Sequence, residues 1–155
     1  MIKVIGIGNR VMGDDGVAIY VLEKIEDEIM KLNSEIEVII GETDFLYCLN
    51  EIDDNDFVII LDSTYLGLEC GTVSFLSFEE AKGYSNNPQT QHDISLVDMI
   101  INYKNCVRGY IIGIEVFDVD FRLSISDSLN EIFKNICNDV LNKIKRVLNN
   151  IEGGK

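Results

Sequence analysis

Apolar and polar positions recur with two different periods along this chain, and the changes between them divide it into strands and helices. Short, nearly continuous apolar runs are typical of strands that are covered on both faces of a parallel sheet. Thr72–Phe78 instead alternates apolar and polar residues after Gly67 and Gly71, which predicts an edge strand that can run antiparallel. The predicted strands are 2–8, Glu35–Gly41, Phe57–Leu61, Thr72–Phe78 and Arg108–Val116.

Segments with a helical period lie between these strands. The last of them has the strongest period, with apolar residues from Leu129 to Leu148 on one face. The predicted helices are 15–32, Phe45–Ile52 with Asp44 as its N-cap, about Ile94 to Tyr103 with Asp93 as its N-cap, and about Ser126–Asn150. Alternating strands and helices predict an α/β layer fold with a twisted, mostly parallel five-stranded sheet, and the length favours one domain over residues 1–155.

Composition narrows the functional classes. Hydrophobic residues make up 46% of the chain, yet no apolar run approaches the roughly 20 residues that span a bilayer, so we expect no membrane insertion. The net charge of -14 argues against nucleic acid and is compatible with a basic protein segment or a metal cation. None of the four cysteines forms a C-x-x-C pair, and the chain starts directly in a strand pattern, which favours a cytoplasmic protein with reduced thiols.

Acidic residues follow two of the apolar runs, and the single histidine lies in a loop. Asp14 and Asp15 come after the first predicted strand, and Asp62 follows Phe57–Leu61 directly. His92 lies in a polar, turn-rich stretch. Ligands of α/β sheets bind at the carboxyl ends of the strands, so these groups can gather at one edge. Two carboxylates and one imidazole suit a borderline divalent metal.

Each of these residues also has a purely structural interpretation. Asp14 or Asp15 can cap the helix that follows, and we favour this role for Asp14 over Asp15. Asp62 can bond its own backbone in an Asx-turn, and this alternative is as well supported as a site role. His92 can be a surface residue, whereas Asp93 beside it can either orient the imidazole or cap the next helix.

Three further acids lie near the same predicted edge. Glu42 and Asp44 follow the second strand, and Glu115 ends the last strand. We interpret Glu115 as a solvated strand end and keep the other two as additional candidates. The loop itself opens with Gly6-Ile7-Gly8, as a dinucleotide-binding loop does, but Val11 stands where a third glycine belongs, and two acids oppose a phosphate there.

Taken together, Gly6-Ile7-Gly8-Asn9, Gly13-Asp14-Asp15-Gly16, the strand ending in Asp62, the loop His92 and Ile112-Gly113-Ile114-Glu115 resemble the hydrogenase maturation endopeptidases. The resemblance covers nearly the whole chain in the same order. It implies one α/β domain with helices on both faces of the sheet, and an endopeptidase that removes a short C-terminal peptide from the large-subunit precursor of a nickel-iron hydrogenase.

The same resemblance implies that this cleavage follows nickel insertion and that the inserted nickel is the recognition signal. The metal-contacting and catalytic positions of the family fall on Asp15, Asp62 and His92 here, although some members carry glutamate at the first of these. Either a carboxylate or a metal-polarised water can then be the attacking group. No nucleotide cofactor is expected.

Other functional classes remain open at this point. A nucleotide-binding module, a metallohydrolase that acts on a small molecule, a spore-type protease of the same fold and a silent metal sensor would each use a similar sheet. Tight binding of metal by the isolated protein would favour the metallohydrolase, and thermal stabilisation by a nucleotide would favour the binding module.

Overall fold

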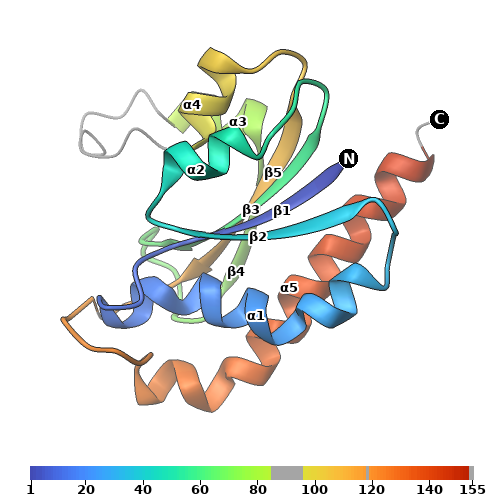
Figure 1. Ribbon diagram of the computed structural model, residues 1–155. Helices are drawn as coiled ribbons and strands as arrows, with labels where there is room; N and C mark the ends of the chain where they lie inside the picture. Colours follow the sequence, from blue (N-terminus) through green and yellow to red (C-terminus); the bar gives the residue numbers. More distant parts are fainter. Residues whose placement is uncertain (85–95, 118, 154–155) are drawn as a thin grey trace.

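Five strands form one sheet at the centre of the molecule, in the order β2-β1-β3-β5-β4 (Figure 1). The computed structural model describes residues 1–84, 96–117 and 119–153. The strands are β1 (Ile2–Ile7), β2 (Ile36–Glu42), β3 (Phe57–Thr64), β4 (Val73–Ser77) and β5 (Arg108–Glu115). Neighbouring strands pair in parallel except for β4, which runs antiparallel to β5 at the edge. The predicted five-stranded, mostly parallel sheet with an antiparallel edge strand is therefore confirmed.

Helices cover both faces of this sheet (Figure 1). They are the short 3-10 helix η1 (Gly13–Gly16), α1 (Val17–Met30), α2 (Phe45–Asn50), α3 (Phe78–Tyr84), α4 (Leu96–Tyr103) and α5 (Asp127–Gly153). One apolar core joins α1 and α5 to one face, and a second core joins α2, α3 and α4 to the other. Because side chains alternate along a strand, Val4 belongs to the first core while Ile5 belongs to the second.

The structure differs from the predicted elements at three places. The predicted helix over 15–32 is divided, because Gly13–Gly16 forms a separate 3-10 turn before α1. Strand β3 continues to Thr64, so Asp62 lies within the strand rather than after it. Helix α3 was not predicted, because its Phe78 had been assigned to the preceding edge strand.

The carboxyl ends of the four parallel strands share one edge of the sheet, at the left in Figure 1. The loops after β1, β2, β3 and β5 all leave from that edge. The segment after β5 then crosses back to the loop after β1, where Met12 and Arg122 form an isolated parallel bridge. Within the described residues, no helix is both long and apolar enough to cross a membrane.

Candidate active site at the carboxyl edge of the sheet

Ser63 connects two of the predicted site residues. Its hydroxyl donates a hydrogen bond of 2.7 Å to Oδ1 of Asp15, and its backbone N–H donates one of 2.8 Å to Oδ1 of Asp62. The two carboxylates therefore lie on either side of one residue, although 48 positions separate Asp15 from Ser63 in the sequence. Parallel pairing of β1 with β3 brings them to the same edge.

The third predicted residue, His92, lies outside the described residues, as does Asp93. Within the part of the chain that the structure describes, no group of three or more His, Cys, Asp or Glu side chains is arranged to hold a metal ion. Asp15 and Asp62 supply carboxylate oxygens only, which by themselves suit hard cations better than nickel. Adding an imidazole nitrogen to these carboxylates would make the set of ligands suitable for a borderline metal.

The glycine at position 8 is what allows the first loop to pass so close to Asp15. Its φ angle is +143°, and a Cβ at this position would lie 2.3 Å from the backbone oxygen of Asp15. The next N–H, that of Asn9, donates a bond of 2.9 Å to Oδ2 of Asp15. The Gly-x-Gly opening thus positions a carboxylate, and both oxygens of Asp15 are fixed by neutral donors.

Asp14 does not cap a helix, contrary to our preferred interpretation, and neither does Asp15. Neither η1 nor α1 has a side-chain cap. Asp14 is fully buried, and it accepts hydrogen bonds from both the backbone N–H and the hydroxyl of Ser126. The guanidinium of Arg122 lies 3.6 Å from the same carboxylate. Asp14 therefore fastens the start of α5 to the first loop and faces away from solvent.

Glu115 is not a solvated strand end, so that prediction was wrong as well. The residue is only 2% exposed, and its carboxylate accepts four hydrogen bonds. The donors are the Thr64 hydroxyl and the backbone N–H groups of Leu66, Gly67 and Leu68. Burial alone would raise the pKa of Glu115, but these hydrogen bonds outweigh it and lower the pKa below its ordinary value. The charged side chain holds the loop after β3 in place.

Tyr65 is a residue of this edge that the sequence analysis missed. Partial burial of its phenol, the negative charge of Asp15 and, to a lesser degree, those of Asp14 and Asp62 raise its pKa to about 12. A side-chain hydrogen bond with Ser63 acts in the opposite direction. The phenol of Tyr65 therefore keeps its proton at neutral pH. A tyrosine so soon after Asp62 was the only available signal in the sequence.

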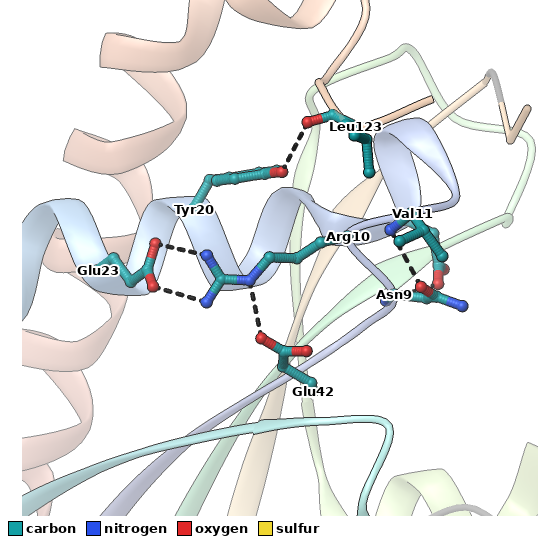
Figure 2. A network of polar contacts seen from close by, with 8 residues as sticks. Asn9, Arg10, Val11, Tyr20, Glu23, Glu42 and Leu123 are labelled. Carbon is teal, nitrogen blue, oxygen red and sulfur yellow. Dashed lines mark hydrogen bonds and ion pairs between the residues drawn. The ribbon is translucent and has the colours of Figure 1, made fainter. Parts of the chain in front are cut away.

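Glu42 takes part in a surface network beside the first loop (Figure 2). The guanidinium of Arg10 donates one hydrogen bond to Glu42 and two to Glu23, and it lies 5.5 Å from the centre of the Tyr20 ring. Tyr20 in turn donates to the backbone oxygen of Leu123. Since Arg10 already engages Glu42, this carboxylate supports the loop.

Asp44 has the capping role predicted for it. Its carboxylate accepts a hydrogen bond of 2.9 Å from the backbone N–H of Tyr47, at the start of α2. Asp15 and Asp62 are therefore two acids of this edge that both accept a hydrogen bond from Ser63. Carboxylates can bind a cation or take a proton from water, and either can assist hydrolysis of an amide.

Comparison with known proteins finds a family model, curated relatives and solved structures that share one description. A family model described as hydrogenase maturation protease matches residues 19–143. A protein of Methanocaldococcus jannaschii described as a putative hydrogenase maturation protease is 24% identical over 151 residues, which cover 94% of this chain and 97% of that protein.

Solved structures of the same description share the fold. The hydrogenase maturating endopeptidase HybD from Escherichia coli superposes with a TM-score of 0.73 at 18% identity, over 94% of this chain and 93% of that one. The [NiFe] hydrogenase maturation protease HycI from Thermococcus kodakarensis gives a TM-score of 0.71 at 19% identity, over 94% and 92% of the two chains.

Proposed function

This chain belongs to the hydrogenase maturation protease family, and we propose that it removes the C-terminal extension of a nickel-iron hydrogenase large-subunit precursor after nickel insertion. The observation that carries this proposal is the carboxylate pair that Ser63 connects. The pair lies at the sheet edge where α/β enzymes bind their ligands.

In this proposal the nickel belongs to the substrate. Asp15, Asp62 and His92 act as the groups that contact it, and they discriminate a loaded precursor from an empty one by completing its coordination. Imidazole and carboxylate groups are both common ligands of first-row divalent metals. The same contact places the C-terminal extension beside the carboxylates, so that recognition and cleavage share one edge of the sheet.

The chemical step is hydrolysis of one peptide bond. Water attacks the scissile carbonyl carbon while a carboxylate of the pair accepts its proton. The carbon–nitrogen bond then breaks, and the leaving amine receives that proton. Ser63 and Asn9 hold the Asp15 carboxylate by neutral donors, so its charge remains available for this task. Precise positioning of this kind is worth several kcal/mol in an enzyme.

The first test compares nickel-loaded and nickel-free large-subunit precursor from the same source, with C-terminal shortening followed by intact mass. We expect cleavage of the loaded form alone. Asp15→Asn should abolish cleavage, while Asp27→Asn, an exposed aspartate on α1 far from this edge, should not change it. Cleavage of neither precursor by the wild-type protein would refute the proposed substrate, and equal cleavage of both would refute the nickel checkpoint.

A further inference from the structure

Two loops at the carboxyl edge expose large apolar side chains to solvent. Phe117 and Phe121 are 89% and 82% exposed, more than any other large apolar residue that the structure describes. They belong to a set that we call the apolar rim: Tyr65, Leu66 and Leu68 after β3, and Phe117, Phe121 and Leu123 after β5. Single exposed apolar residues are common on protein surfaces, but six on two short loops beside a candidate site indicate an interaction surface.

Buried carboxylates hold both loops in these positions. Glu115 accepts the backbone N–H groups of Leu66, Gly67 and Leu68, which fixes the backbone of the first loop. The second loop is fixed at its far end by Asp14, which accepts two hydrogen bonds from Ser126. Two buried carboxylates therefore fix the backbones of the loops from which these apolar side chains project.

Backbone contacts tie the second loop to the site itself. Arg122 donates its N–H to the carbonyl of Val11 and accepts the N–H of Gly13 through its own carbonyl. Leu123 accepts the Tyr20 hydroxyl, as Figure 2 shows. Because Asp15 follows Gly13 in the same turn, a partner seated on the rim is fixed relative to the carboxylate pair.

The charges around the rim indicate what kind of surface it meets. Its two loops carry the exposed acids Glu69 and Asp120. Their one basic residue in the described sequence, Arg122, faces Asp14. The chain as a whole has a net charge of -14, so a second copy would be repelled. The surface that complements the apolar rim is an apolar patch bordered by Lys and Arg side chains.

We propose that the apolar rim is the docking surface for the large-subunit precursor, which meets it with an apolar patch bordered by basic residues. This inference rests on the proposed function and extends it, because it separates two contributions to substrate choice. The carboxylate pair contacts the metal and the C-terminal segment, whereas the apolar rim binds the rest of the precursor. Because the backbones of both loops are already held by hydrogen bonds, docking costs little loop-ordering entropy.

The test measures binding and processing of nickel-loaded precursor by wild-type protein, the double variant Phe117→Ser/Phe121→Ser, and the control Tyr103→Ser. Tyr103 is 73% exposed and ends α4, which leads to the opposite edge of the sheet. The control therefore replaces an aromatic residue of similar exposure that lies away from the apolar rim. We expect the double variant to raise the Kd and the KM about tenfold or more with kcat and Tm nearly unchanged, and the control to behave like wild type. Added salt should raise the Kd of the wild-type complex.

Failure of this inference is distinguishable from failure of the proposed function. Processing by the double variant with an unchanged KM would overturn the rim and leave the protease function intact. Binding that depends on Phe117 and Phe121 without any cleavage by wild type would support the rim and refute the function. Neither binding nor cleavage by wild type would overturn both. Self-association of wild type that the double variant abolishes would assign the rim to a second copy and overturn the precursor as its occupant.

Discussion

Replacing Glu115 by glutamine tests whether a buried charge holds the loop after β3. The substitution preserves shape but turns one acceptor oxygen into an amide donor. Oε2 accepts from the Thr64 hydroxyl and the Leu66 N–H, and Oε1 accepts from the N–H groups of Gly67 and Leu68. One backbone N–H or more must therefore face an N–H₂ group in the variant, whichever way the amide turns.

The expected loss of stability follows from these four hydrogen bonds. Hydrogen bonds to a charged group contribute about 1.5–3 kcal/mol each, and the variant retains about half of them in weaker, neutral form. Relief from burying a charge offsets part of the loss. The net cost is on the order of 3 kcal/mol, which for a chain of this length corresponds to a fall in Tm of about 6–12 °C.

Thermal unfolding followed by circular dichroism at neutral pH measures this change, with Glu69→Gln as the control. Glu69 is exposed in the same loop, so its substitution should leave the Tm within about a degree of wild type. A Glu115→Gln variant whose Tm fell by less than about 2 °C would refute the role assigned to the carboxylate, because at least one N–H would then have lost its charged partner without cost.

The same variant should also change how stability depends on pH. The pKa of Glu115 is lowered by folding from its ordinary value of 4.5, because the hydrogen bonds to the charged form outweigh burial. Its contribution is therefore complete above pH 4.5 and is lost as the pH falls through the folded-state pKa. Wild type should lose stability more steeply than Glu115→Gln below that pH, measured by urea unfolding. Parallel curves would contradict the assignment.

Three further outcomes are expected. Asp14→Asn should lower the free energy of unfolding by about 3 kcal/mol, measured by urea denaturation, because an amide cannot accept both bonds from Ser126; an unchanged midpoint would contradict this. Gly8→Ala should reduce processing and the Tm together, since its methyl group meets the backbone oxygen of Asp15, and full activity would refute the close approach. In ultraviolet titration, Tyr65 should ionise at about pH 12 in wild type and at lower pH in Asp15→Asn, because one negative charge is removed; equal values would exclude the proximity.

The positions of Asp15 and Asp62 at one edge could be predicted because they depend on few rules. Short apolar runs between helical segments require parallel strands, and parallel strands place their following residues at a common edge. The capping role of Asp44 was likewise local, since a cap and its helix are neighbours in the sequence. The role of Asp15, Asp62 and His92 in catalysis stays a prediction until the variants are measured.

The errors fell where the partner of a residue is distant in the sequence. Asp14 was predicted to cap a helix and Glu115 to be a solvated strand end. Both proved to be buried carboxylates that hold loops in place. Ser126, the partner of Asp14, is 112 positions away. The donors to Glu115 are 47 to 51 positions away, in a loop with no regular pattern. Helix α3 was missed because it is short and follows β4 without a turn.

The sequence by itself determined the class of fold, one edge strand and the edge at which the acids gather, because hydrophobic period and the geometry of parallel sheets are local or general. The order of the strands in the sheet came only from the structure. The tertiary structure decided what each of two adjacent aspartates contacts. In a 3-10 turn successive side chains point about 120° apart. Asp14 therefore turns to the interior and Asp15 to Ser63, and only the packed neighbours select between these directions.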